Sequence, residues 1–553
     1  MSYVPPHRWQ EVTDRITLLS LDDRFWLSLA LLAGLGVHLV YLLTHPYPAY
    51  GAGLYLAVAE QISTHGYTLP AMVPGYTAGG VPLAYPPLAF YVAAIARDLT
   101  GIGPFAYSRL VPGMLVTAAL VPFYFTAKEL LDSPRRAGLA TLVLAGTPSA
   151  LQWHLSAGGI VRGLAFLLAL SGIYVGVRLF DTEDVRWLPV ATVLFGLTVL
   201  THPVYTVFFG LTYLLLFAAR SRTPRGLVYG AVVAGGGFLI AAPWLWHVHT
   251  THGITTLTAA AGTHGGLVGG FHRVLTELVY PIDRDLEAAF FLAAYFAAAV
   301  SLVRRRLLLP VWLFVVGFVI GKPRFLFVPG SMLTAWFVFE YGVPTVRSLA
   351  RSAQLGRSRR RFVELAAVGL VVLAAVGSGT AFAAGALDTH NGDPSQPAFV
   401  DAGDEEAMTW VERETPRSAE FVVLGDAAEW FPLVTDRPIL VGPWGVEWTT
   451  PEQYETQLTR FEAISACDTA PCLTRHLERA DVTPTHLYVP KGHYTVRGQS
   501  FHQSPEMRAS LLASDHYEIV HETESAMIVR VTDTGDTERL AAPKRVERYE
   551  HGD

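Results

Sequence analysis

The chain has 553 residues, of which 51% are hydrophobic and only 16% are charged, and its mean hydropathy is +0.34. Soluble proteins carry about 25% charged residues, so membrane spans are expected here. Residues 1–387 hold 27 basic and 17 acidic side chains, whereas residues 388–553 hold 14 and 30. This excludes a single soluble globule, a disordered chain, a coiled coil and a nucleic-acid binder of the basic-patch type. We expect a multispan membrane domain over 1–387 and an acidic soluble domain over 388–553.

Long apolar runs recur along the membrane domain. A helix of about 17–25 such residues is enough to cross a bilayer. We identify twelve runs, and we expect 11–13 transmembrane helices, because an N-terminus inside and a tail outside require an odd number. The runs are 25–43, 86–102, 107–130, 136–152, 158–180, 187–201, 203–220, 226–247, 288–303, 307–321, 323–346 and 363–387.

The arginines predict which loops face the cytoplasm. The loops 220–225, 304–306 and 347–361 carry three, three and six arginines, so we expect them inside. Residues 44–86 contain no Lys or Arg and are expected outside, together with the tail after the last span. The sequence therefore predicts a multi-pass protein of the cell membrane whose C-terminal domain is extracytoplasmic.

The outer loop 44–86 is long and rich in aromatic residues, Gly and Pro. Within it, residues 52–64 read as an amphipathic helix that lies in the membrane interface. Long loops in compact proteins usually serve function. The alternative is a lid that only covers the helices. A second outer loop is expected at 248–287.

The tail alternates between helical and extended patterns. Its last two strands are expected to form a hairpin, and the sequence past Asp533 is charged and expected to fray. The tail therefore predicts a small α/β domain. The expected helices are 404–414, 451–466 and 471–479, and the expected strands are 420–424, 438–441, 485–489, 516–521 and 525–531.

Two features of composition concern the environment of the tail. The two cysteines, Cys467 and Cys472, are both in it, and an extracytoplasmic location permits a short-loop disulfide between them. The chain has four Lys against 37 Arg. An acidic, lysine-poor domain suits the high salt of a halophilic archaeon. A GC-rich genome that favours Arg is the alternative explanation.

Several motifs resemble the GT-C superfamily of membrane glycosyltransferases. A multispan body with an outward α/β tail is also similar to oligosaccharyltransferases and dolichyl-phosphate-mannose-dependent transferases. The resemblance implies transfer of a sugar, of mannose type, from a polyprenyl- or dolichyl-phosphate carrier to a glycan or glycoprotein at the outer face. The matching stretches are 55–60 (YLAVAE), 65–67 (HGY), 85–88 (YPPL), 158–166 (GGIVRGLAF), 201–203 (THP) and 321–330 (GKPRFLFVPG).

One departure from the superfamily concerns the catalytic acid. The resemblance implies an acidic residue shortly before Tyr55, but residues 51–54 read Gly-Ala-Gly-Leu. Glu60 is the only carboxylate of 44–86, so it is the candidate base. An ordinary surface glutamate is the alternative, and the missing acid also leaves room for a non-catalytic relative.

Basic residues near the outer face are candidates for binding the carrier phosphate. Lys322 and Arg324 begin a span at its expected outer end, where basic residues are rare. Arg162, near the end of another span, is a companion candidate. Snorkelling anchors are the alternative explanation for the first pair. Tyr55 and Tyr85 are expected to line the sugar site, although interfacial anchoring also explains tyrosines there.

Three histidines, His247, His249 and His252, lie within six residues. Three imidazoles so close together suit a divalent ion such as Mg²⁺ or Mn²⁺ only weakly, and histidines in an outer loop are more often unliganded. The resemblance implies acidic rather than histidine ligands for such an ion.

Two other functions compete with a glycosyltransferase. A flippase of lipid-linked glycans requires an internal repeat and polar residues at mid-membrane depth, and neither is evident. A catalytically inactive scaffold that binds glycan or carrier is favoured by the two glycines at 51 and 53. The expected partners are a lipid-linked sugar, its acceptor and membrane lipid, with no nucleic acid.

Overall fold

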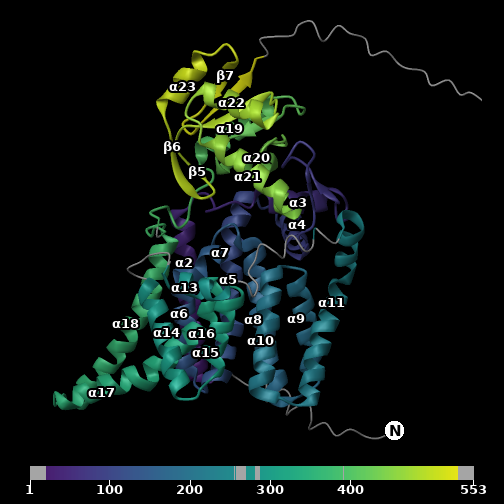
Figure 1. Cartoon of the computed structure of the whole chain (residues 1–553). Helices are drawn as coiled ribbons and strands as arrows, with labels where there is room; N and C mark the ends of the chain where they lie inside the picture. The colour runs from purple at the N-terminus through teal and green to yellow at the C-terminus, as the bar shows by residue number, and fades with distance from the viewer. Residues whose placement is uncertain (1–19, 254–255, 257–268, 280–286, 390, 533–553) are drawn as a thin grey trace, which may run out of the picture.

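The structure is a computed structural model that describes residues 20–253, 256, 269–279, 287–389 and 391–532. A body of roughly parallel helices carries a mixed α/β region at one end (Figure 1). The polytopic helical body and its C-terminal α/β region are confirmed as the fold class.

Seven helical stretches of the described chain are long and apolar enough to cross a membrane. Three further apolar helices, α9 (Trp187–Val199), α14 (Glu287–Val303) and α15 (Leu308–Val319), are shorter. The long stretches are α2 (Leu21–Thr44), α5 (Pro104–Leu131), α8 (Gly159–Thr182), α10 (Pro203–Leu216) with the π-turn Phe217–Ser221, α11 (Pro224–His252), α16 (Pro323–Phe337) continued through the π-turn Val338–Gly342 into α17 (Val343–Ser352), and α18 (Arg357–Ala383).

Two of the predicted spans are wrong. The run 86–102 forms only α4 (Leu88–Thr100), whose 13 residues extend about 20 Å, short of a hydrocarbon core of about 30 Å. The run 136–152 is broken into α6 (Pro134–Gly146) and α7 (Pro148–Leu155), because Pro148 starts a new helix at its first position. The predicted count of 11–13 is therefore higher than the number of long helices in the described chain.

Small residues let the helices of the body approach closely. Gly172 and Gly176 lie one turn apart on α8, and the rings of Phe209 and Tyr213 on α10 occupy the space beside them. A side chain at either glycine would overlap one of these rings. This spacing of small residues is typical of packed membrane helices.

The outer loop forms a compact layer between the body and the α/β region. It contains α3 (Gly53–Thr64), which confirms the predicted helix 52–64, and a short hairpin of β1 (Met72–Val73) and β2 (Val81–Pro82). Helix α3 packs on β1, which is also in the outer loop, and on α4, which follows the loop. It also packs on α20 of the α/β region. The loop is thus a structured platform for the C-terminal region.

The C-terminal region contains a four-stranded sheet in the order β3-β4-β8-β7. Strands β3 and β4 are parallel, and β4–β8 and β8–β7 are antiparallel. The predicted hairpin of the last two strands is confirmed. The elements are α19 (Ala402–Glu414), β3 (Phe421–Val423), α20 (Phe431–Thr435), α21 (Pro451–Ser465), α22 (Ala470–Ala480), β4 (His486–Pro490), β5 (Gly492–Val496), β6 (Gln499–Gln503), α23 (Pro505–Leu512), β7 (Tyr517–Glu522) and β8 (Ala526–Val531).

The predicted strand at 438–441 is wrong in its extent. Only an isolated bridge joins Ile439 to Phe421, and the amide of Ile439 donates instead to the carbonyl of Gly75 in the outer loop, at 2.8 Å. The apolar run at 438–441 predicts a strand. Its residues are buried partly because the outer loop covers them. The β5–β6 hairpin and α23 were not predicted.

The outer loop and the C-terminal region are joined by backbone contacts. Ala49 bridges Ala398, and the amide of Tyr50 donates to the carbonyl of Pro397 at 2.9 Å. The two segments therefore lie at the same end of the helical body. The arginine-bearing helix α17 lies at the opposite end (Figure 1).

The side of the membrane on which these segments lie can be tested with engineered cysteines. We expect an impermeant thiol reagent to label Ala78→Cys and Glu506→Cys in intact cells but Arg359→Cys only after lysis, because the arginine-rich end is retained inside. All three positions are exposed, and the native cysteines are paired. If Arg359→Cys alone were labelled in intact cells, the orientation of the protein in the membrane would be the opposite of the one expected here.

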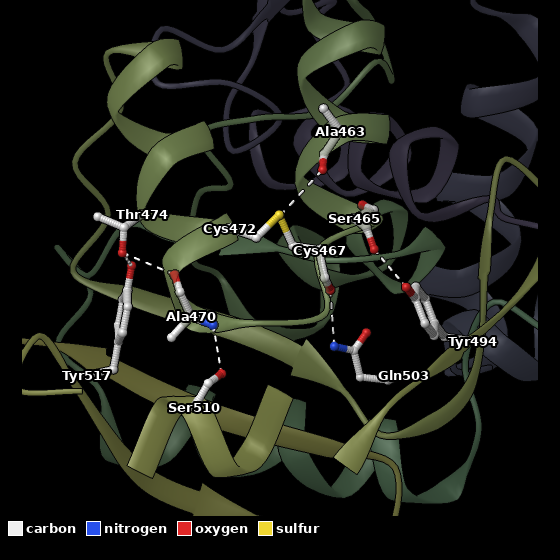
Figure 2. Close-up of a disulfide and its surroundings, with 10 residues drawn as sticks. All are labelled: Ala463, Ser465, Cys467, Ala470, Cys472, Thr474, Tyr494, Gln503, Ser510 and Tyr517. Carbon is white, nitrogen blue, oxygen red and sulfur yellow. Dashed lines mark hydrogen bonds between the residues drawn. A yellow bond between two sulfur atoms is a disulfide. The ribbon is translucent and has the colours of Figure 1, made fainter. Parts of the chain in front are cut away.

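The disulfide that the sequence permits between Cys467 and Cys472 is present, and it closes the turn between α21 and α22 (Figure 2). The turn is held from several sides. Gln503 Nε2 donates to the carbonyl of Cys467 at 3.1 Å, and the Tyr494 hydroxyl donates to the carbonyl of Ser465 at 2.7 Å. Ser465 Oγ in turn accepts the amide of Gly425, at 3.0 Å. The disulfide thus supports the segment that begins at Gly425.

Removal of the disulfide is expected to lower the stability of the C-terminal region. A loop of this size contributes about 2 kcal/mol through the entropy of the unfolded chain. The double variant Cys467→Ser/Cys472→Ser should therefore unfold several degrees below the wild type in a thermal scan. Reducing agent should lower the wild type to the same temperature and leave the variant unchanged. An unshifted variant would show that the bond contributes nothing measurable.

Candidate active site

Aromatic side chains from three parts of the chain meet at the boundary between the helical body and the C-terminal region. The ring of Tyr85, in the outer loop, lies 5.9 Å from that of Tyr55 on α3 and 5.8 Å from that of His202 before α10. It also lies 5.7 Å from the ring of Trp448 in the C-terminal region. Tyr55 and Tyr85 keep part of their surface exposed. The cluster places the two predicted tyrosines in one site.

Arg162 lies beside this aromatic cluster, in the first turns of α8. Its guanidinium stacks over Trp153 at 5.1 Å and donates to the carbonyl of Gly158 at 3.1 Å. It also interacts with the hydroxyl of Tyr55. A half-buried arginine next to a tyrosine hydroxyl is suited to hold an anion.

Arg324 approaches the same place from the first turn of α16. Its side chain is only 7% exposed, and its guanidinium lies 5.8 Å from the ring of Tyr205. Its buried Nε has no hydrogen-bond partner among the described residues. The Tyr205 hydroxyl is 2.5 Å from His154 Nε2. An arginine with an unsatisfied buried donor is costly unless an anion binds it.

The two arginines share one site. Arg162 and Arg324 act electrostatically on each other and both act on Tyr205. Within the described ranges, no carboxylate lies within 4.0 Å of either guanidinium. Both arginines belong to the N-terminal turns of their helices, where the helix dipole favours negative charge. The fold thus brings together two cations from positions that are 162 residues apart in sequence.

The other predicted phosphate ligand, Lys322, has a different environment. It is the N-cap residue of α16 and its side chain is exposed, whereas Arg324 two residues later is buried. The structure therefore separates the predicted pair into one buried cation and one surface cation.

Glu60, the candidate base, lies on the outer face of α3. Its side chain is half exposed and is 4.0 Å from the guanidinium of Arg97. It lines an open groove of about 860 Å³ with residues of β1 and of α20. Glu60 follows Tyr55 by five residues, which is a rotation of about 140° around the helix axis, so the two side chains point in different directions. The structure does not bring Glu60 to the aromatic cluster.

Carboxylates reach the site from the C-terminal region instead. Glu429 ends the short 3-10 helix Asp426–Glu429 and is 7% exposed, and Glu447 lies in a second 3-10 turn, Val446–Trp448. Glu429 lies against the start of α3. A side chain at Gly51 would overlap its carboxylate, and one at Gly53 would overlap its backbone carbonyl. The glycines of the outer loop thus create the space that Glu429 fills.

Burial dominates the proton affinity of these carboxylates. It raises the pKa of Glu429 to about 8, and the neighbouring Asp426 carboxylate acts in the same direction. The positive charges of Arg497 and Arg162 oppose the increase only partly. Burial likewise raises the pKa of Glu447 to about 7, although its side chain keeps part of its surface exposed. Carboxylates with such shifted pKa values are typical of functional sites.

The histidines do not form a metal site in the described chain. His247 and His252 are partly buried at the end of α11, but His249 is exposed and lies beside Trp246. In the parts of the chain that the structure describes, only Cys467, Cys472 and His476 come close enough together to share an ion, and the two cysteines are disulfide-bonded. Within the described residues, the three histidines therefore do not form a preformed site for a divalent ion.

Glu429, Glu447 and Trp448 were not predicted as site residues. They lie more than 370 positions after Tyr55, in turns without regular periodicity. One signal pointed to them indirectly: a loop expected to carry an acid carries two glycines instead, and space at Gly51 and Gly53 implies a partner that fills it.

Comparison with known proteins identifies a related family and fold. Residues 84–247 match the family described as dolichyl-phosphate-mannose-protein mannosyltransferase. No curated protein matches the sequence at a significant level. The matched segment includes Tyr85, Arg162, His202 and Tyr205 of the site.

Several solved structures share the fold. One is the oligosaccharyltransferase AglB of Archaeoglobus fulgidus in complex with an inhibitory peptide and a dolichol-phosphate. It has a TM-score of 0.54 at 13% identity, and the match covers 91% of this chain and 80% of the AglB chain. ArnT from Cupriavidus metallidurans in the apo state has a TM-score of 0.55 at 13% identity, and the match covers 91% of this chain and 97% of ArnT. The mycobacterial arabinofuranosyltransferase AftD has a TM-score of 0.52 at 13% identity, and the match covers 94% of this chain and 40% of AftD. These likenesses confirm the resemblance to the GT-C fold.

The close approach at Gly53 predicts a stability effect. In Gly53→Ala the new Cβ would overlap the backbone carbonyl of Glu429, so the C-terminal region must shift. We expect a loss of about 1–3 kcal/mol, as for other overpacked sites, seen as a lower unfolding temperature. Gly79→Ala, at a glycine with open space around it, is the matched control and should unfold like the wild type. Equal unfolding temperatures for both variants would contradict the described seating of the C-terminal region.

Proposed function

We propose that this chain, which has the GT-C fold of membrane glycosyltransferases, moves a sugar from a polyprenyl-phosphate carrier to an acceptor at the outer membrane face. The observation that carries the proposal is the pair of buried or half-buried arginines, Arg162 and Arg324, that share one site without a carboxylate partner in the described chain. A phosphate that gains negative charge as the sugar leaves is the ligand that such a pair stabilises best.

The position of the arginine pair suits a lipid donor. Both arginines begin long apolar helices at the end of the body where the outer loop packs. A carrier phosphate lies at the level of the lipid headgroups, so its isoprenoid tail remains in the bilayer while the phosphate reaches the arginines. A dolichol-phosphate bound to the AglB structure supports the same class of donor here.

The sugar and the acceptor are proposed from the family match. The mannosyltransferase family that matches residues 84–247 supports a dolichyl-phosphate-linked hexose of mannose type. We propose that the reaction is inverting. The peptide in the AglB structure supports a glycoprotein or glycan as the acceptor. Tyr55, Tyr85 and Trp448 offer flat apolar faces on which a sugar ring can stack. The acidic, lysine-poor C-terminal region supports a high-salt environment.

The arginine pair is tested by sugar transfer from radiolabelled dolichyl-phosphate-mannose. Arg324→Ala and Arg162→Ala should each lower the rate by about 10²–10³, as for loss of other transition-state donors. Arg324→Lys should retain more activity than Arg324→Ala, because a point charge replaces a planar fork. Lys322→Ala should have a smaller effect than Arg324→Ala, because its side chain is exposed.

Arg186→Ala, at an exposed arginine of the loop before α9, is the control and should transfer like the wild type. A double variant of Arg162 and Arg324 that keeps wild-type transfer would show that neither binds the carrier phosphate.

A further inference from the structure

We propose that Glu429, supplied by the C-terminal region, is the catalytic base that takes the proton from the acceptor hydroxyl. The inference deepens the proposed function and rests on it. Glu429 lies on the chain more than 340 residues after the outer loop in which the sequence predicts a base, and the fold brings it to that loop.

The position of Glu429 is fixed from both sides of the boundary. The hydroxyl of Tyr76, in the outer loop, donates to the Glu429 carbonyl at 2.9 Å. The next residue, Trp430, packs its ring 4.9 Å from that of Phe105 at the start of α5. The carboxylate occupies the space left by Gly51. A base must be held in place relative to its substrate, and these contacts provide that support.

The neighbouring carboxylates have other roles. Asp426 accepts the backbone amides of Arg497 and Gly498, at 2.8 and 2.7 Å, and so holds the β5–β6 turn. Glu447 accepts backbone amides of its own 3-10 turn. Glu60 lies in the groove on the other face of α3. Burial and neighbouring charges are the largest influences on Glu429, and its carboxylate, unlike the other three, lies against Gly51 of the outer loop.

Arg162 connects the base to the phosphate site. It acts electrostatically on Glu429, on Tyr55 and on Arg324. The charge of one guanidinium therefore reaches both the carboxylate and the second arginine.

The reaction is a displacement at the anomeric carbon of the donor sugar. The acceptor oxygen forms a bond to the anomeric carbon of the donor sugar while its proton passes to a Glu429 oxygen. The bond from the anomeric carbon to the phosphate oxygen breaks, and its electron pair stays on the phosphate, which leaves as polyprenyl phosphate beside Arg162 and Arg324. The proton on Glu429 then returns to water.

The principal test compares Glu429→Gln with the wild type in transfer from radiolabelled dolichyl-phosphate-mannose and dolichyl-phosphate-glucose. The acceptor is an envelope glycoprotein and glycolipid extract from a strain that lacks the gene. Loss of a general base should lower the rate by about 10²–10⁴, while donor binding and unfolding temperature stay unchanged. Glu414→Gln removes an exposed carboxylate of α19 and should transfer like the wild type.

A second variant tests the location of the carboxylate. In Glu429→Gly/Gly51→Asp the new carboxylate starts from the space that the Glu429 carboxylate occupies. We expect it to recover part of the transfer lost in Glu429→Gly. A folded double variant that recovers none would count against the proposal, and this arm remains informative if Glu429→Gln proves unstable.

The pH profile supplies a separate readout. Because burial raises the pKa of Glu429 to about 8, wild-type transfer should rise with pH up to about 8 and then level off. Glu429→Gln should lose this rise. The charged and titratable groups that interact with Glu429 are Asp426, Glu447, Arg497, Arg162, Tyr76 and Tyr55.

Wild-type transfer in Glu429→Gln, or an unchanged pH profile, would overturn the assignment of the base while leaving the proposed function in place. A wild-type protein that transfers neither sugar would overturn the proposed function and, with it, this inference.

Discussion

The contact on which the site depends is the seating of one short turn of the C-terminal region, Asp426–Glu429, on the glycines at the start of α3. Gly53 cannot carry a side chain without moving that turn, and a side chain at Gly51 would displace the Glu429 carboxylate. Because backbone meets backbone here, the orientation of the C-terminal region is fixed closely. The aromatic contact between Tyr85 and Trp448, and the arrival of two buried carboxylates beside the helical body, follow from that orientation.

The site keeps opposite charges apart. The helical body contributes Arg162 and Arg324, and the C-terminal region contributes Asp426, Glu429 and Glu447. A direct ion pair would neutralise both sides, but in the described chain no carboxylate lies within 4.0 Å of the arginines. Unpaired charges are costly in a medium of low dielectric constant. The cost is offset when a substrate brings a phosphate to the arginines and a hydroxyl to the carboxylate.

The sequence predicts those features that depend on local pattern. Apolar runs give most of the long helices, alternation gives the last hairpin, and the positions of Tyr55, Tyr85, Arg162 and Arg324 agree with a shared site. Contacts between distant segments leave no local pattern. Glu429 lies in an irregular turn, and its role depends on a docking surface that only the fold creates. Similarly, the burial of Ile439 reflects the covering outer loop, so a bridge was predicted as a full strand.

The division of the site between two regions also links the two halves of the proposed reaction. Arg162 lowers the proton affinity of Glu429, and it lies at the phosphate site. As the bond to the sugar breaks, the phosphate gains negative charge and compensates the charge of Arg162. The pKa of Glu429 then rises further, at the moment when it must accept the acceptor proton. Cleavage of the bond to the carrier therefore strengthens the base. Before that bond begins to break the base stays weaker, which limits activation of water and loss of the sugar by hydrolysis.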